Sequence, residues 1–445
     1  MRRGVFGACP TLLAAVGLAT AQTPDAPPPA PQSAAAINLP PFAPLPDNVG
    51  EQPAGGTANG KPVWTDTHVG PQQTAWLSAG YSFMWLQEGP QPFPLAIVGP
   101  PASRTIGGSN IDFGTFNGMK ADGGFWFDQC HRTGVYFGGF FTEQRSVSDS
   151  ATSDALGSPA ISRPYIDALR GTNLIQAVSI PGFVAGGFGF NADARLLGAE
   201  AGLLRNLYEC QSYTVNMLLG YRYLDLDENL ELTQISRNID GSPIPYAALP
   251  GNLGQSAAAV LIQDRFHTRN SFFGGTIGFD YEYRIGRLSA GLVYKVSLGT
   301  NHENVEIIGQ TSAADGSNSV SGGLLAVPGI PARIGNVNGM PVLIPALPNA
   351  NFGRNTNNRF VVVPEVGLKL GWQLTDSFRL ISGADFLYMN DVARPGSQID
   401  PVVNQRYVPV SPLYGTTAGP VSPTFTYRSD SFYAFGVNFG CEFKY

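Results

Sequence analysis

The sequence is poor in charged residues and has no long apolar run. Charged residues make up only 13% of its 445 positions, against about 25% in typical soluble domains. So little charge cannot cover the surface of a large soluble protein. The longest uncharged stretches are residues 171–192, 241–263 and 334–353, and each is interrupted by Pro, Gly or Asn. These interruptions exclude a helical membrane protein, whose spans need about 20 consecutive apolar residues.

Cysteine and the motifs of common enzymes are also scarce. Beyond Cys9 near the N-terminus the chain has Cys130, Cys210 and Cys441, whose spacing fits neither a disulfide framework nor a zinc site. No G-x-S-x-G, H-E-x-x-H or P-loop motif is present. We therefore expect no catalytic residues, no metal and no cofactor. The net charge of −6, without a basic patch, argues against nucleic acid as a partner.

Glycine and aromatic residues are abundant instead. The chain holds 54 glycines and 11% aromatic residues. Apolar and polar residues alternate over many short stretches, with the period of two that strands with one apolar face show. Composition and alternation together predict a large all-β protein.

The N-terminal region has the features of an export signal followed by a linker. Arg2 and Arg3 precede the apolar run Leu12–Leu18, and Ala19-Thr20-Ala21 is a small-residue cleavage site, so residues 1–21 are expected to be a signal peptide. Residues 22–73 are rich in Pro, Ala and Gly and are expected to form a disordered periplasmic lead-in. Residues 74–445 would form the folded domain of an exported, bacterial protein.

Ten alternating strands are expected in that domain. In chain order they cover residues 74–87, 115–128, 133–145, 192–207, 211–230, 268–285, 287–299, 360–374, 377–389 and 431–445. Short turns near His131, Cys210, Gly286 and Asp376 close four pairs, and the other connections are long, roughly 88–114, 146–190, 231–267, 300–358 and 390–430. The even strand number and strict alternation of connections predict a transmembrane antiparallel up-and-down β-barrel, with short periplasmic turns and long extracellular loops. Only a closed barrel lets strands satisfy every backbone group in lipid.

Aromatic residues support a membrane location. They cluster on the apolar face at both strand ends, as in the girdles that mark the two membrane interfaces. The last strand alternates Phe439, Cys441, Phe443 and Tyr445 up to the final residue. We interpret Phe439, Phe443 and Tyr445 as a C-terminal insertion signal read by the barrel assembly machinery. Outer-membrane lipid is then a partner of the wall, and the outer membrane is the expected location.

The polar face of the strands carries eleven charged residues that would point into the lumen. Five are basic and six acidic: Lys120, Asp122, Glu200, Arg222, Asp280, Glu282, Lys295, Glu365, Lys369, Arg379 and Asp385. Charges in a confined space are costly unless they pair, so they could form a salt-bridged filling. They could equally line a selective pore. Ten strands lie near the number at which side chains just fill a barrel.

Histidines at the loop end raise the question of catalysis. His267 and His302 flank one strand pair there, with Asp264 and Glu303 nearby in sequence. A carboxylate–histidine pair within hydrogen-bonding reach could activate water at the rim. The sequence does not fix such a geometry, so solvated loop histidines are expected and the protein is not expected to be an enzyme.

Two further features stay open at the level of sequence. Cys130 and Cys210 lie in short turns of an oxidising compartment, but successive turns should be about 10 Å apart, beyond the roughly 7 Å that a disulfide spans. The apolar, glycine-rich loops 175–190 and 324–347 could fold over the barrel mouth as a cap or bind a neighbour.

Several blocks of the chain resemble the planctomycete family called β-barrel porin-7. They are GYRYLDLDE (Gly220–Glu228), TRNSFFGGTIG (Thr268–Gly278), KVSLG (Lys295–Gly299), GGLLA (Gly322–Ala326), FVVVPEVGLKLGWQLTD (Phe360–Asp376), RPGSQID (Arg394–Asp400) and FGVNFGCEFKY (Phe435–Tyr445). They occur in the family's order and span about Trp76–Tyr445. The resemblance implies an outer-membrane barrel, and it carries over no functional residue.

The leading functional hypothesis is a porin-type barrel that passively admits small polar solutes. The alternative is a structural or adhesive surface protein with a filled lumen and functional extracellular loops. A hydrolase at the rim is a distant third. The free space in the lumen separates the three.

Overall fold

The computed structural model describes residues 74–210, 212–248, 254–337, 340–416 and 419–445. The expected signal peptide and lead-in, residues 1–73, lie outside the described residues. The described part contains two short 3₁₀ helices, η1 (Gly396–Gln398) and η2 (Gln405–Tyr407). No helix of the described part is long and apolar enough to cross a membrane.

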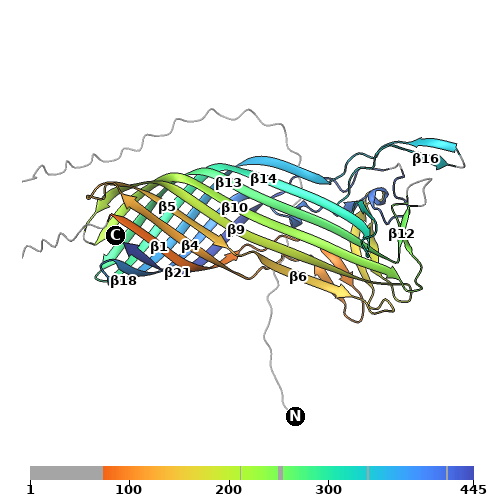
Figure 1. Cartoon of the computed structure of the whole chain (residues 1–445), viewed down its shortest axis with the longest axis horizontal. Helices are drawn as coiled ribbons and strands as arrows, with labels where there is room; N and C mark the ends of the chain where they lie inside the picture. Colours follow the sequence, from red (N-terminus) through yellow and green to blue (C-terminus); the bar gives the residue numbers. More distant parts are fainter. Residues whose placement is uncertain (1–73, 211, 249–253, 338–339, 417–418) are drawn as a thin grey trace, which may run out of the picture. The chain divides into compact units, whose positions relative to one another are not determined.

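Ten strands of the described chain form a closed antiparallel ring, which confirms the predicted barrel (Figure 1). In ring order they are β1 (Ala75–Leu86), β4 (Thr115–Trp126), β5 (Thr133–Thr142), β9 (Val184–Glu209), β10 (Tyr213–Asn238), β13 (Ala259–Ile285), β14 (Leu288–Ala313), β18 (Gly353–Thr375), β19 (Phe378–Ala393) and β21 (Ser429–Lys444). The ring closes where the last strand pairs with the first. There the backbone N–H of Tyr445 donates to the carbonyl of Ala75 at 2.8 Å.

Several strands are longer than the sequence predicts. β9, β10 and β14 have 26 residues each, and β13 has 27. At about 3.3 Å per residue such strands run for about 85 Å, far more than a tilted strand needs to cross about 30 Å of hydrocarbon. Much of the expected loops 231–267 and 300–358 is therefore wall. β6 (Arg145–Thr152) and β15 (Ser319–Ser321) pair with this extended part.

The reason for the extra length is visible in β10, where the polarity of the two faces reverses. Near the short turn the outward residues are apolar, such as Leu219, Tyr221 and Tyr223. Beyond Tyr223 the outward positions hold Asp225 and Asp227, and the inward positions hold Leu224, Leu226, Leu230 and Leu232, which are buried. The lower wall therefore faces lipid, and the upper wall faces water around an apolar core. Period two continues through the reversal, so the strand does too.

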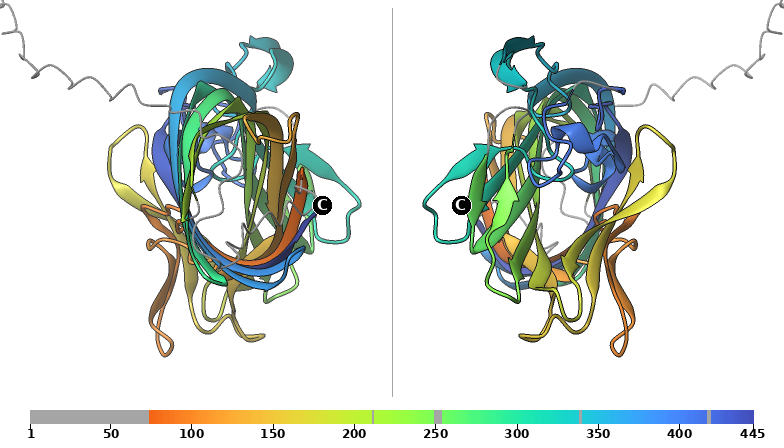
Figure 2. Two further views of the ribbon diagram at one scale, coloured as in Figure 1. Left: turned by 90° about the vertical axis from the view of Figure 1, so that its left-hand side faces the viewer. Right: turned by 90° about the vertical axis from the view of Figure 1, so that its right-hand side faces the viewer.

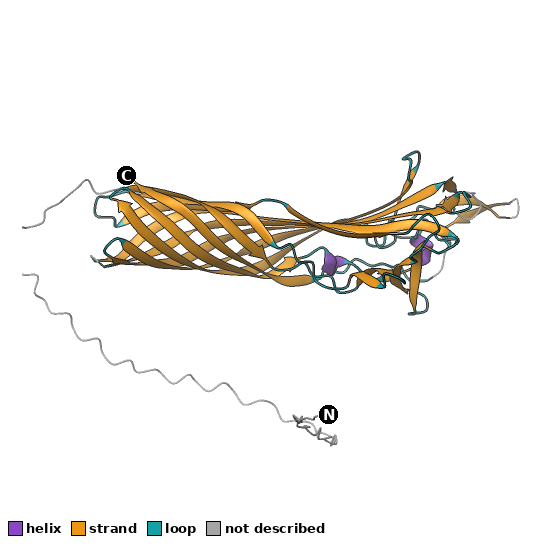
Figure 3. Cartoon of the chain, turned by 90° about the horizontal axis from the view of Figure 1, so that it is seen from below, coloured by secondary structure: helices purple, strands orange, loops and turns teal. Residues whose placement is uncertain are grey.

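The loops at the far end from the short turns build a second, smaller sheet (Figure 3). Its strands are β20 (Val402–Val403), β7 (Ile161–Asp167), β2 (Pro94–Val98) and β3 (Arg104–Gly107), with β8 (Asn173–Ser179) paired to β7. Two hairpins complete the loops: β11 (Ile244–Tyr246) with β12 (Gln255–Ala257), and β16 (Arg333–Val337) with β17 (Met340–Ile344).

The views along the barrel show loop segments within the ring of strands (Figure 2). The largest hydrophobic core lies inside the upper barrel, between its wall and these loops. Inward side chains such as Phe266 and Phe272 of β13 are fully buried there. Two segments pack among them, residues 392–400, which begin with the last two residues of β19, and residues 324–327 after β15, and every residue of both is buried. We call these two segments the plug. Their burial shows that the extracellular half of the barrel has a packed interior.

Candidate functional site: the charged lumen and its plug

The structure brings ten of the eleven charged residues expected in the lumen into ion pairs. Lys120 pairs with Asp385 at 2.7 Å, and Arg379 pairs with Glu282 at 2.6 Å. The other pairs are Lys369–Asp122, Arg222–Glu365, Lys295–Glu200 and Lys295–Glu365. The eleventh residue, Asp280, lies within electrostatic range of Lys369.

These ion pairs bridge the lumen. In a ring of ten strands, residues five strands apart face each other. Lys369 and Asp122 belong to β18 and β4, which lie four strands apart. The pairs that Lys120, Arg222 and Lys295 make with Asp385, Glu365 and Glu200 each join strands three apart. Side chains of opposite charge therefore span the interior at several levels.

One buried level of the lumen consists of Arg222, Glu365, Lys295 and Glu200, which we call the constriction. Their side chains come from β10, β18, β14 and β9 and are only 4%, 10%, 11% and 15% exposed. Lys295 contacts both carboxylates, and Arg222 contacts Glu365. Each charge thus has an opposite charge beside it, as burial requires.

The charges between the constriction and the short turns differ in exposure. Arg379 and Glu442, nearest the turns, are only 11% and 9% exposed. Lys369 is 42% exposed and Asp122 is 28% exposed, although both lie in the interior. Lys120 and Asp385 are about a quarter exposed. The exposure of the interior charges therefore varies from level to level, with a buried cluster at the turn end and more open charges above it.

Three polar residues of the lumen were missing from the sequence-based set. Glu442 accepts from Arg379 at 2.8 Å, and the side-chain amide of Asn438 donates to Asp385 at 2.8 Å. Tyr136 lies in electrostatic range of the constriction and is almost fully buried. The alternation of inward and outward residues along each strand could have identified them. Glu442 and Asn438 alternate with the outward Phe443 and Phe439, and Tyr136 alternates with the outward Phe137.

Above the constriction, buried ion pairs tie the loops to the barrel wall. Arg394 of the plug donates to Glu228 of β10 at 2.8 Å, and Arg163 of β7 donates to Asp264 of β13 at 2.7 Å. Both pairs are at most 2% exposed. The free oxygen of Asp264 accepts two backbone N–H groups, from Leu325 and the next residue, at 2.9 Å each. One wall carboxylate therefore holds two loops.

A third buried cluster lies beyond the membrane-facing part of β14. Glu303 and Asp391 share the guanidinium of Arg359, at 3.6 and 3.3 Å. Burial, and then the neighbouring charge of Asp391, raises the pKa of Glu303 to about 7. This carboxyl group therefore changes its protonation near neutral pH, in contact with the segment that leads into the plug.

The histidines do not form the rim site that their spacing suggested. His267 points outward, with Nε2 2.8 Å from Asp227 Oδ1, and His302 Nδ1 lies 2.6 Å from Asn358 Oδ1. Asp264 and Glu303, the carboxylates near them in sequence, are buried inside the barrel. The strand geometry separates these carboxylates from the histidines, because two residues an odd number of positions apart in a strand point to opposite faces of the wall. The contact with His267 lowers the pKa of Asp227 to about 2.

The disulfide considered between Cys130 and Cys210 is not formed. Among the described residues Cys130, Cys210 and Cys441 are free thiols. Cys130 follows β4 and Cys210 follows β9, so their turns are separated by about two strand spacings, or roughly 10 Å.

The two apolar, glycine-rich loops 175–190 and 324–347 contain both buried and exposed residues within the described part of the chain. Leu324 and its neighbours up to Val327 are buried as part of the plug. Ile334 and Leu343 of the β16–β17 hairpin are instead about 70% exposed, and Phe183 of the other loop is 72% exposed. Part of these loops is therefore packed inside the barrel, as a cap would be, and whether the exposed part binds a neighbour stays a prediction.

The match to a known family decides what kind of barrel this is. The model of the family described as "Putative beta barrel porin-7" matches residues 91–329 and 345–445. The chain belongs to this family. As a porin-7 barrel it resides in the bacterial outer membrane, with its short turns in the periplasm and its long loops outside. No curated protein matches the sequence.

Solved outer-membrane barrels are similar only at a distance. The outer membrane protease OmpT from Escherichia coli is 10% identical, with a TM-score of 0.35, over 84% of this chain and 98% of that one. The Pseudomonas putida toluene transporter TodX is 10% identical, with a TM-score of 0.26, over 84% of this chain and 90% of that one. A Pseudomonas aeruginosa FadL homologue is 10% identical, with a TM-score of 0.20, over the same shares.

The blocks that resembled the porin-7 family fall on the charged lumen and the plug. Arg222 and Glu228 belong to GYRYLDLDE, Glu365 and Lys369 belong to the block in β18, and Arg394 opens RPGSQID, which is buried throughout. In this member of the family, these blocks supply charged residues of the constriction and the ion pair that anchors the plug.

Proposed function

We propose that this porin-7 barrel is a closed outer-membrane protein whose barrel anchors and presents its folded loops at the cell surface. The observation that carries the proposal is the double obstruction of the lumen. Ion pairs span the constriction, and the plug above it is packed in a buried apolar core. Opening a path would expose buried apolar surface and unpaired charges at once, which costs many kcal/mol.

The exposed part of the loops supports a binding role for the surface. Ile334, Leu343 and Phe183 each leave most of their surface in water, at the end of the barrel that faces outward. Exposed apolar side chains of this kind are the groups that a binding partner would cover. The proposed role is not catalytic. Asp264 and Glu303 lie inside the wall, away from the outward histidines, and the carboxylate that His267 does contact, Asp227, is already paired with Arg195.

A second candidate function is passive passage of small polar solutes. The observation in its favour is the partial exposure of Lys369 and Asp122, two charges of the lumen. Passage would require the plug to leave the barrel, or at least to release Arg394 from Glu228.

Liposome swelling separates the two functions. Purified full-length protein is reconstituted in vesicles, which are diluted into an iso-osmotic solution of a small sugar. The closed barrel predicts swelling no faster than protein-free vesicles, and swelling at a rate that falls with sugar size would support passage. A variant lacking residues 394–400 separates the two obstructions: with the constriction intact it should still not swell, and swelling would show that the plug alone had closed the lumen.

A further inference from the structure

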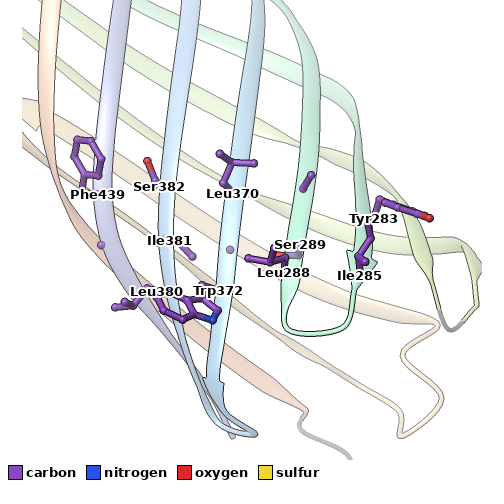
Figure 4. A pocket seen from close by; sticks show the side chains of 13 residues that line it. Tyr283, Ile285, Leu288, Ser289, Leu370, Trp372, Leu380, Ile381, Ser382 and Phe439 are labelled. Carbon is purple, nitrogen blue, oxygen red and sulfur yellow. The ribbon is translucent and has the colours of Figure 1, made fainter.

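A groove of about 660 Å³ indents the outer face of the barrel wall next to the short turns (Figure 4). Its lining comes from β13, β14, β18, β19 and β21 and is almost entirely apolar. The surrounding outward residues are exposed and apolar, for example Leu370 and Phe439. The groove therefore lies in the part of the wall that faces the periplasmic leaflet of the membrane.

The groove exists because large and small residues alternate around the wall. One lateral row of paired residues reads Tyr283, Ala290, Leu370, Ser382 and Phe439 across five neighbouring strands. The large members project outward, and the missing volume at Ala290 and Ser382 leaves a gap between them. A lipid-facing wall needs no such gap, because acyl chains pack equally well on a smooth surface.

The groove has an aromatic edge and a cation beside it. Tyr283 and Trp372 line it near the turns, at the level where amphipathic rings meet lipid headgroups. Arg287 is exposed in the β13–β14 turn, between the lining residues Ile285 and Leu288. Its carbonyl accepts from the backbone N–H of Gln373 at 2.8 Å, which holds this turn against β18 beside Trp372.

We propose that the groove is a binding site for a phospholipid of the periplasmic leaflet. One acyl chain fills the space over Ala290 and Ser382, and the phosphate lies on the guanidinium of Arg287. The apolar lining fits the chain, and an arginine at the interface matches the charge and geometry of a phosphate. The site is independent of whether the lumen conducts, because it lies on the opposite face of the wall.

Quenching by brominated lipid tests the site. The full-length protein is reconstituted in phosphatidylcholine vesicles with rising fractions of phosphatidylglycerol that carries a brominated acyl chain. The emission of Trp372 is obtained as the difference between the wild type and Trp372→Phe. Brominated diacylglycerol, which has the same chains and no phosphate, is the comparison lipid.

The proposal predicts saturable quenching of Trp372, with half-saturation at an about fivefold lower fraction of phosphatidylglycerol than of diacylglycerol, the factor that one interfacial arginine supplies. Arg287→Gln should remove that difference and leave quenching by diacylglycerol unchanged. Ser382→Phe, which fills the groove, should make quenching simply proportional to the bulk lipid fraction. Ala121→Phe is the matched control, since Ala121 is an exposed outward residue of β4 at a similar distance from the short turns.

Three results would overturn the proposal. Equal half-saturation for the two brominated lipids in the wild type would remove the phosphate contact. Unchanged saturation in Ser382→Phe would show that the groove is not the site. A Trp372 that no lipid quenches at any fraction would show that a second copy of the chain covers this wall.

Discussion

Arg394 and Glu228 form a buried ion pair that joins the plug to the opposite wall of the barrel. Arg394 directly follows β19, Glu228 lies in β10, and these strands are four apart in the ring of ten. The guanidinium also donates to the backbone carbonyl of Gln87, which directly follows β1, at 3.1 Å, and lies over the ring of Phe432 of β21 at 5.5 Å. A single side chain therefore connects the plug with both sides of the wall.

Arg394→Ala should loosen the extracellular half. It leaves the carboxylate of Glu228 buried without its partner, which costs roughly 3–5 kcal/mol. Urea unfolding of the protein in detergent micelles measures the loss. Arg195→Ala is the matched control, because Arg195 pairs with Asp227 while about half exposed on the outer wall and should cost less than about 1 kcal/mol.

The double variant Arg394→Met/Glu228→Gln checks the cause. It removes both charges while keeping most of the packing volume, so it should recover most of the loss. A double variant as unstable as Arg394→Ala would mean that the lost contacts, and not the stranded charge, weaken the fold.

Stability should depend on pH through Glu303. Its pKa is raised from 4.5 to about 7 by burial and by Asp391, so the folded protein holds this proton more tightly than the unfolded chain. The stabilising contribution is complete below about pH 4.5 and is lost as the pH rises through 7, about 3 kcal/mol in all. Unfolding at pH 5 and pH 8 should show this decline in the wild type. Glu303→Gln, which cannot ionise, should flatten it, and an unchanged decline would assign the dependence to another group.

The last strand should be needed for insertion. β21 pairs with β1 from Ala434 to Lys444, with Phe443 opposite Leu77 and Phe439 opposite Tyr81, and the rings of both phenylalanines point outward. Deleting Phe443–Tyr445 removes the end of this closure and the aromatic pattern together, so the protein should be degraded in the periplasm. Membrane fractionation and immunoblotting measure this. Cys441→Ser in the same strand is the control and should insert normally.

Epitopes placed in turns should report the orientation of the barrel. Gly286 and Gly316 both have positive φ and have no atom within 4 Å of the place where a side chain would begin, so both turns can accept an insertion. An antibody should reach an epitope at Gly316 on intact cells, and one at Gly286 only after the outer membrane is opened. The reverse pattern would place the long loops in the periplasm.

The alternation of apolar and polar residues with period two predicted the ten strands, the closing strand pair and the inward orientation of Lys295 and Glu365. It succeeded because a wall surrounded by lipid must turn its apolar side chains outward and its polar side chains inward. The same rule fails beyond Tyr223. There the wall is surrounded by water instead of lipid, and apolar side chains such as that of Leu226 point inward. Sequence also left open which charges pair, since Lys369 and Asp122 are brought together only by ring closure. The burial of RPGSQID could not be predicted, because Glu228, the ion-pair partner of its Arg394, lies 166 residues away in the sequence.

Single-channel recording of the purified full-length protein tests the closed lumen most directly. With the constriction paired and the plug in place, we expect no steady conductance, or a small one with weak ion selectivity, at neutral pH. Arg222→Ala leaves Glu365 and Glu200 undercompensated, so any residual current should shift toward cations in a salt gradient. A large, steady and strongly anion-selective conductance in the wild type, unchanged by Arg222→Ala, would contradict the account.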